Sequence, residues 1–132
     1  MMMRQNRFWI LAPGVFVLLL DVLITYLLQP AEYWRLGYEY TTEGSPHGFL
    51  LMRYHPLAFL AFILAYILVV GILVYRLPAP WHKVIALAVV IGHTAGIHTW
   101  LRHRYYWLMI FNFILFAAIT LFSWHKGEVG WK

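Results

Sequence analysis

The sequence predicts an all-α, polytopic integral membrane protein, an antiparallel four-helix transmembrane bundle with an interfacial segment between the first two spans. Its composition is 63% hydrophobic and 11% charged, against about 25% charged in a soluble protein. Its apolar stretches approach the roughly 20 residues that a helix needs to cross a bilayer. A single membrane domain of 132 residues is therefore expected, with spans at about 8–28, 56–75, 84–101 and 105–124.

The composition also limits the function. The absence of cysteine excludes disulfides, iron–sulfur clusters and zinc–thiolate sites. The net charge of +5 comes from basic residues scattered at segment ends, as membrane topology requires, and not from a patch that would bind nucleic acid. There is no phosphate-binding glycine loop and no GxSxG. The expected partners are the lipid bilayer and other membrane protein chains or a second copy, without nucleic acid, and an enzyme is the less favoured class.

The first span, 8–28, follows Arg4 and Arg7. A secretory signal has the same basic start, but this apolar run is long and lacks a small-residue cleavage site, which favours an uncleaved span. Asp21 lies past its middle, where a charged acid facing lipid costs about 2.5–3.5 kcal/mol. Asp21 is therefore expected to face the bundle or to be protonated, with Thr25 one turn further on the same face.

The connection 29–55 leaves the membrane and carries Glu39 and Glu43. The aromatic residues in its first half predict a short helix at the headgroup level. GSPHG, residues 44–48, predicts a turn. A connection of this length in a small protein often serves a function, although a simple cap is the alternative.

The remaining spans are bounded by short links. The second, 56–75, is uncharged and begins with a proline, whose missing N–H does no harm there. Only three residues separate 84–101 from 105–124, so these two spans should be antiparallel neighbours. Placing the amino end inside puts six lysines and arginines on the cytoplasmic side and four outside. The positive-inside rule then predicts N-in and C-in, and the expected location is a prokaryotic plasma membrane.

The third span carries a ladder of small residues, Ala88, Gly92 and Gly96. Their spacing of four predicts a smooth face along which another helix can approach. Ordinary helix packing is the first interpretation of this face, and a dimerisation motif is the second.

Two groups of residues are candidates for chemistry. Asp21, with Thr25, and His93 should lie at similar depth in different spans, where they could hold a proton, bind a metal or polar ligand, or simply link two helices by a hydrogen bond. The second group would lie toward the outer face and consists of imidazoles and carboxylates, the ligands that a transition metal uses when thiols are absent: His47, His55, His98, His103, Glu39 and Glu43.

The spacing of these histidines is not specific for a metal. There is no HExxH motif, and a histidine at the end of a span is commonly an interfacial residue. His93 and His98 are five residues apart, about 140° around a helix, so they cannot both bind one ion from an unbroken helix. A haem or pigment with a single axial histidine, His93 or His98, is a further candidate cofactor.

The segments LLLDVLITYLL, EGSPHGF, HPLAFLAFILAYILVVG and VVIGH together resemble a group of small prokaryotic four-span membrane proteins without an established function. Those proteins have an Asp-x-x-x-Thr first span and a glutamate and a proline in the next loop, which here correspond to Asp21, Thr25, Glu43 and Pro46. Ser45 replaces an expected asparagine, and the aromatic loop is longer. The resemblance implies four spans and a role for Asp21 and Thr25.

Two functions follow as hypotheses. The absence of a strong catalytic motif and the many interfacial aromatic residues favour a non-catalytic accessory or assembly subunit of a membrane complex. The alternative is a histidine and carboxylate site that binds a metal, a haem or a proton-coupled ligand, because seven histidines are many for so apolar a chain.

Overall fold

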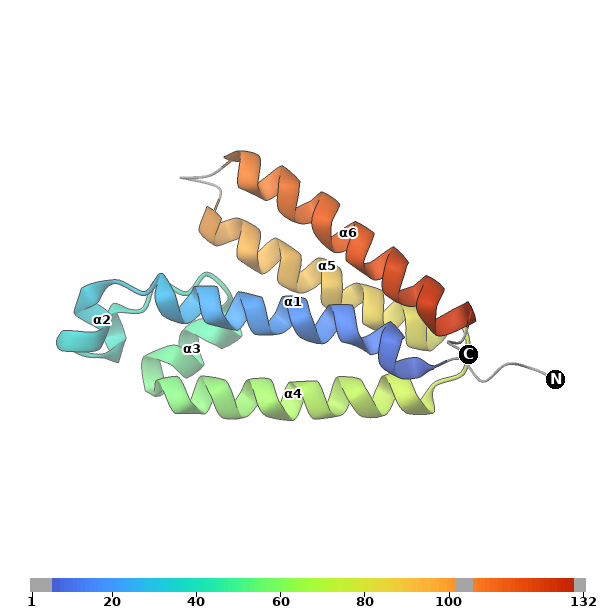
Figure 1. The fold of residues 1–132 in the computed structure, drawn as a ribbon. Helices are drawn as coiled ribbons and strands as arrows, with labels where there is room; N and C mark the ends of the chain where they lie inside the picture. The colour runs from blue at the N-terminus through green and yellow to red at the C-terminus, as the bar shows by residue number, and fades with distance from the viewer. Residues whose placement is uncertain (1–5, 102–105, 130–132) are drawn as a thin grey trace.

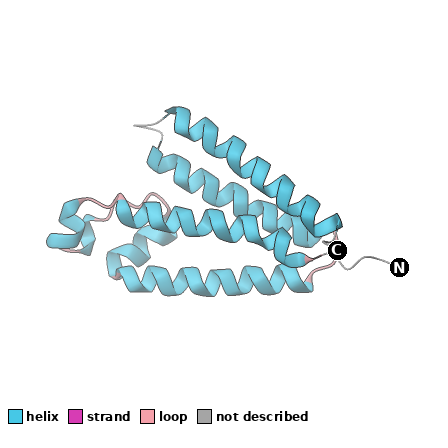
Figure 2. Ribbon diagram, in the orientation of Figure 1, coloured by secondary structure: helices cyan, strands magenta, loops and turns pink. Residues whose placement is uncertain are grey.

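The computed structural model describes residues 6–101 and 106–129, and its regular elements in these ranges are all helices (Figures 1 and 2). Four of them are long and apolar enough to cross a membrane. They are α1 (Arg7–Leu27), α4 (Pro56–Arg76), α5 (Trp81–Leu101) and α6 (Tyr106–Val129). The predicted all-α bundle of four spans is therefore confirmed.

Helices α1 and α5 form the centre of the bundle. Each packs against the other three long helices, and their contact with each other is the most extensive (Figure 1). Gly14 permits this close approach, because a Cβ there would lie 3.2 Å from Val89 Cγ1 and 3.5 Å from the Ala86 carbonyl oxygen. One core cluster joins Ile10 of α1 to Val74 of α4 and Ala86 of α5. The α1–α5 pair thus positions any residue that faces the middle of the bundle.

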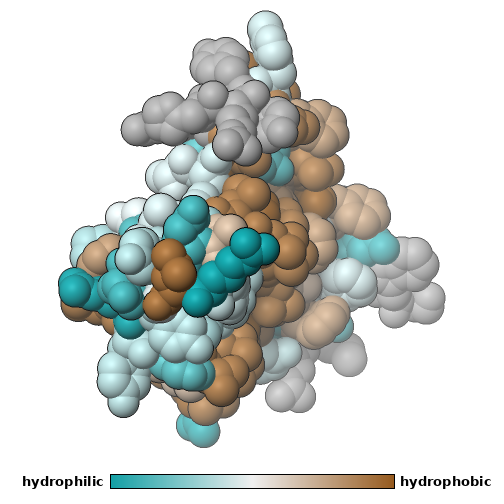
Figure 3. Space-filling model, turned by 90° about the vertical axis from the view of Figure 1, so that its left-hand side faces the viewer, coloured by the Kyte–Doolittle hydropathy of each residue, from teal (hydrophilic) through white to brown (hydrophobic). Residues whose placement is uncertain are grey.

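The outer faces of the long helices are apolar. Leu64, Leu68 and Leu121 are among many large hydrophobic side chains that are exposed. Figure 3, viewed from the end that carries α2, shows hydrophilic side chains gathered over the connection between α1 and α4 and apolar surface along the helices beside it. Such a surface is expected to contact lipid chains, because in water it would promote aggregation.

The connection between α1 and α4 contains more helix than the sequence indicated. It forms α2 (Ala31–Arg35), the 3-10 helix η1 (Tyr38–Tyr40) and α3 (Pro46–Tyr54). The turn predicted at 44–48 is wrong for its last three residues. The Ser45 hydroxyl accepts a hydrogen bond from the Gly48 N–H at 3.2 Å, and Pro46 occupies the first helical position, so these residues start α3.

Helix α3 lies between the end of α1 and the start of α4 (Figure 1). Its Met52 is fully buried and packs in one cluster with Leu18 of α1 and Phe59 of α4. Tyr33 of α2 is also fully buried and donates a hydrogen bond from its hydroxyl to the Met52 carbonyl oxygen at 2.9 Å. Burial, assisted by two neighbouring tyrosines, raises the pKa of Tyr33 to about 12. The connection is therefore packed against the bundle.

Candidate functional site

Asp21 and His93 meet between the two central helices. Asp21 Oδ2 of α1 lies 2.8 Å from His93 Nδ1 of α5. The two side chains remain 16% and 20% exposed, respectively, and the ring of Tyr66 on α4 contacts the His93 ring edge-to-face at 5.7 Å between centroids. The pair therefore lies where α1, α4 and α5 converge, and it combines a carboxyl and an imidazole at hydrogen-bonding distance.

Gly96 makes room for this contact. A Cβ at Gly96 would lie 2.7 Å from Asp21 Oδ2 and 2.9 Å from Oδ1, closer than side chains pack. The carboxyl group of Asp21 is thus seated against the backbone of α5. Glycine at position 96 is a requirement of the site and not only of helix packing.

The other small residues of the predicted face do not share this role. Ala88 and Gly92 are exposed, and a Cβ at Gly92 would meet no atom within 4 Å in the described part of the chain. The small-residue face is thus divided, with Gly96 turned toward Asp21 and the other two residues turned outward.

The contact constrains where the proton sits. An ionised carboxylate can only accept hydrogen bonds, so His93 Nδ1 carries the hydrogen when Asp21 is charged. The opposite ring nitrogen, Nε2, is then the acceptor of the neutral imidazole. Histidines held by a carboxylate in this way commonly use the free nitrogen to bind a proton or a ligand.

A second carboxylate, Glu43, lies in the loop before α3. Glu43 Oε1 accepts hydrogen bonds from the Ser45 N–H at 3.0 Å and the Ser45 hydroxyl at 2.7 Å. Its Oε2 is buried without a hydrogen-bond partner among the described residues. Gly48 accommodates the side chain, since a Cβ there would lie 2.8 Å from Glu43 Cγ.

Gln29 adds a polar group just beyond the end of α1, two residues after Leu27. It is buried, and its Oε1 accepts hydrogen bonds from the Thr41 hydroxyl and the Thr42 N–H, both at 3.1 Å. Its Nε2 has no partner within residues 6–101 and 106–129. Thr25, within α1, is likewise buried. The sequence analysis missed Gln29, because it lies outside the helix and helical spacing gave no signal for it.

Among the residues that the structure describes, the outer histidines and glutamates are not gathered at one place. His47 and Glu39 are exposed. His55 caps α4, with its Nδ1 accepting a hydrogen bond from the Leu57 N–H at 3.1 Å. The ring of His98 instead contacts the ring of Phe113 on α6, with 5.5 Å between the ring centroids.

His103 lies outside the described residues. Within residues 6–101 and 106–129, no three histidine, aspartate or glutamate side chains are arranged to hold a metal ion. The metal prediction therefore lacks a three-ligand site in this part of the chain, and axial ligation of a haem by His93 or His98 stays a prediction.

Comparisons with protein-family models, with curated proteins and with solved structures found no match. The predicted resemblance to small prokaryotic four-span proteins is therefore untested. The four apolar helices alone identify the chain as a multi-pass membrane protein.

Proposed function

We propose that the protein binds a small proton-coupled ligand at the Asp21–His93 pair and has no catalytic chemistry of its own. The observation that carries this proposal is the 2.8 Å contact between Asp21 Oδ2 and His93 Nδ1, made between two membrane spans. Ionisable side chains within spans are costly and commonly mark proton or ligand sites. The competing explanation is a hydrogen bond that only braces the two helices.

Two features favour a ligand site over a brace. The pair keeps part of its surface exposed, and His93 Nε2 is left as an acceptor when Asp21 is ionised and the imidazole is neutral. In addition, Glu43, in the connection, has a buried carboxylate oxygen without a hydrogen-bond partner in the described part of the chain. A buried carboxylate oxygen gains substantially from a hydrogen-bond donor, which a proton-carrying ligand or water would supply.

The surroundings of the pair favour entry from one side. Toward the connection between α1 and α4 lie the polar side chains of Thr25, Gln29 and Glu43. The apolar cluster between α1 and α5 continues on both sides of the pair, with Val17 and Val90 on one side and Ile24 and Ile97 toward the connection. Because the polar side chains lie toward the connection, we infer a binding site that opens on that side, and not a continuous path across the membrane.

Cysteine accessibility tests this direction, because the native chain has no cysteine. His93→Cys and the matched inward control Val89→Cys would be treated with a membrane-impermeant maleimide in sealed vesicles of known orientation. We expect labelling of His93→Cys from the connection side and no labelling of Val89→Cys from either side. Equal protection of both thiols would argue that water and ligands do not reach the pair.

A second experiment separates a proton site from a brace. Nitrogen-15 spectra of histidine-labelled protein in lipid nanodiscs would identify the tautomer of the His93 ring and the exchange of its hydrogens with water, with His93→Gln identifying its signals. We expect hydrogen on Nδ1, free Nε2 and exchange with water, and we expect Asp21→Asn to change the tautomer while leaving the fold intact. A His93 ring whose hydrogens do not exchange with water, with both variants unfolding at lower temperature, would support the brace.

An accessory-subunit function is a second candidate, and the outward position of Ala88 and Gly92 favours it. Both residues are exposed on α5, and Gly92 leaves open space beyond its Cα in the described part of the chain. A partner helix could approach this face closely. Gly92→Leu should then reduce co-purification of a partner, whereas cross-linking of native membranes that yields only the monomer would count against this function.

A further inference from the structure

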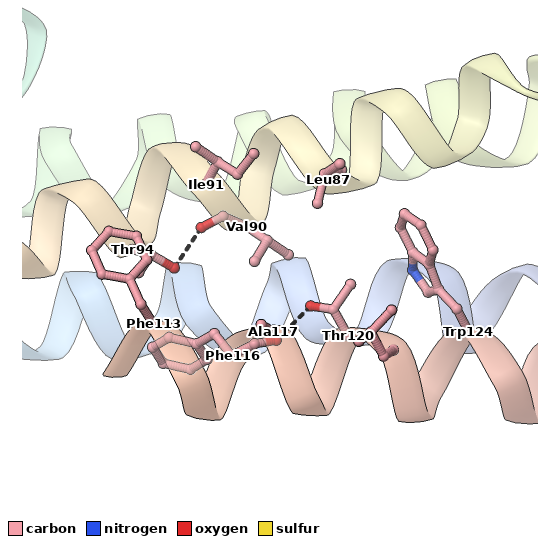
Figure 4. A pocket seen from close by; sticks show the side chains of 10 residues that line it. Leu87, Val90, Ile91, Thr94, Phe113, Phe116, Ala117, Thr120 and Trp124 are labelled. Atoms are coloured by element: carbon pink, nitrogen blue, oxygen red, sulfur yellow. Dashed lines mark hydrogen bonds between the residues drawn. The ribbon is translucent and has the colours of Figure 1, made fainter. Parts of the chain in front are cut away.

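An apolar groove runs between α5 and α6, away from the Asp21–His93 pair. Its volume is about 300 Å³, and its lining includes Leu87 and Ile91 of α5 and Phe113, Ala117 and Trp124 of α6 (Figure 4). The groove is open along one side, and its lining residues belong to two membrane spans. Its natural surroundings are therefore lipid chains.

The polar atoms in the groove wall are already used by the protein. The Thr94 hydroxyl donates to the Val90 carbonyl oxygen and the Thr120 hydroxyl donates to the Phe116 carbonyl oxygen, both at 2.7 Å (Figure 4). The Trp124 indole N–H donates to the Ile10 carbonyl oxygen at 3.4 Å. The groove consequently offers hydrocarbon surface and no free donor, which suits an acyl chain better than a polar ligand.

Two opposite charges lie one helical turn beyond one end of the groove. Lys83 precedes Leu87 by four residues on α5, and Glu128 follows Trp124 by four residues on α6. The two side chains form an ion pair and are 26% and 48% exposed, respectively. Lys83 Nζ also lies 5.7 Å from the centroid of the Trp124 ring. An exposed ion pair contributes little by itself, so both groups can exchange partners with a bound molecule.

The dimensions match one leaflet of a bilayer. From Phe113 to Trp124 the groove follows twelve residues of α6, whose eleven steps rise about 16 Å at about 1.5 Å per residue. Half of a hydrocarbon core measures about 15 Å. The groove thus extends from the charged interface at Lys83 and Glu128 to about the middle of the membrane.

We propose that this groove binds an acyl chain of a phospholipid with a primary-ammonium head group of the ethanolamine type. The lipid phosphate accepts hydrogen bonds from Lys83, and the lipid ammonium donates hydrogen bonds to Glu128. A neighbouring cation and anion match a zwitterionic head group better than a purely anionic one. This lipid site is independent of the function proposed for Asp21 and His93.

The test is native mass spectrometry of the full chain, released from detergent after incubation with equal amounts of ethanolamine, choline and glycerol phospholipids that share the same acyl chains. We expect one tightly retained lipid, with the ethanolamine lipid favoured about tenfold over the choline lipid, which lacks N–H donors. Equal retention of the three lipids would overturn the head-group assignment.

Variants locate the site. Ala117→Phe fills the groove and should remove the retained lipid, whereas Ala118→Phe, at a neighbouring exposed position outside the lining, should not. Glu128→Gln should abolish the preference for ethanolamine over glycerol lipid, and Lys83→Gln should weaken retention of all three. Lys83 is partly exposed and Glu128 is exposed, and both lie near helix ends, so these two charge variants test the proposal even if Ala117→Phe does not fold.

Unchanged lipid retention in Ala117→Phe would exclude the groove as the binding site. A lipid-free dimer that disappears in the same variant would show that a second copy of the chain occupies the groove instead.

Discussion

Replacing Gly96 by alanine should disrupt the Asp21–His93 pair without touching either residue. The added Cβ would lie 2.7 Å from Asp21 Oδ2. To reach an ordinary contact distance, the carboxyl group must move by about 0.7 Å or more. Since Oδ2 is the atom that contacts His93 Nδ1, the displacement pulls the pair apart.

The expected cost combines two effects. Overpacking of a close helix contact costs about 1–3 kcal/mol, and loss of an interhelical hydrogen bond in a membrane costs about 0.6 kcal/mol on average. We therefore expect Gly96→Ala to lower the free energy of unfolding by about 2 kcal/mol. Gly92→Ala is the matched control on the same helix. It should be neutral or stabilising by up to about 1 kcal/mol, because alanine favours the helix.

The assay is equilibrium unfolding in mixed micelles, followed by tryptophan fluorescence, in a double-mutant cycle with Asp21→Ala. Truncating Asp21 removes the atoms that the new Cβ would strike, so Gly96→Ala in that background should behave like Gly92→Ala. The coupling should be about 2 kcal/mol. The proposed geometry would be refuted if Gly96→Ala costs no more than Gly92→Ala, or costs the same with and without Asp21.

Three further predictions concern the ends of the bundle. Because the pKa of Tyr33 is raised to about 12, the stabilisation from its neutral hydroxyl is complete below about pH 10 and is lost as the pH rises toward 12. Tyr33→Phe should therefore be less stable than the native protein by about 1 kcal/mol at pH 8. This difference in the free energy of unfolding should narrow above about pH 10. Arg7 donates hydrogen bonds to three carbonyl oxygens at the end of α4, at 2.5–3.1 Å. Arg7→Gln should therefore lower the free energy of unfolding, measured by thermal unfolding, by about 1–2 kcal/mol. Arg76→Gln, at an exposed position, is the control and should change it by less than about 0.5 kcal/mol. For the N-in, C-in prediction, an impermeant maleimide applied to intact cells should label Gly44→Cys and should leave Ala79→Cys unlabelled; the reverse pattern would invert the orientation.

Sequence alone predicted the number of spans. The predicted spans 8–28 and 56–75 overlap α1 and α4, whereas α5 begins three residues before the predicted 84 and α6 continues five residues beyond the predicted 124. These limits depend on the thickness and polarity of the bilayer, which act on each segment separately. The similar depth of Asp21 and His93 followed from the same reasoning, because depth is a linear property of the chain.

The direction in which each residue faces required the tertiary structure. Residues four apart on a helix are rotated by about 40° from one another, so Ala88 and Gly96 differ by about 80°. That rotation is enough to turn Gly96 toward Asp21 while Ala88 and Gly92 stay exposed. A list of small residues at regular spacing cannot supply the angle at which the helix is rotated against its neighbours.

The path of the connection was likewise decided by tertiary contacts. GSPHG has the composition of a turn, but Ser45 and Pro46 start a helix there because Met52 of α3 has a buried place beside α1 and α4. That placement also seats the Glu43 side chain against Gly48 of α3. The sequence by itself therefore determined the fold class, the spans and the depth of the polar residues, because these depend on the solvent. Only the tertiary structure decided which polar residues meet, because that depends on helix rotation and on contacts between distant segments.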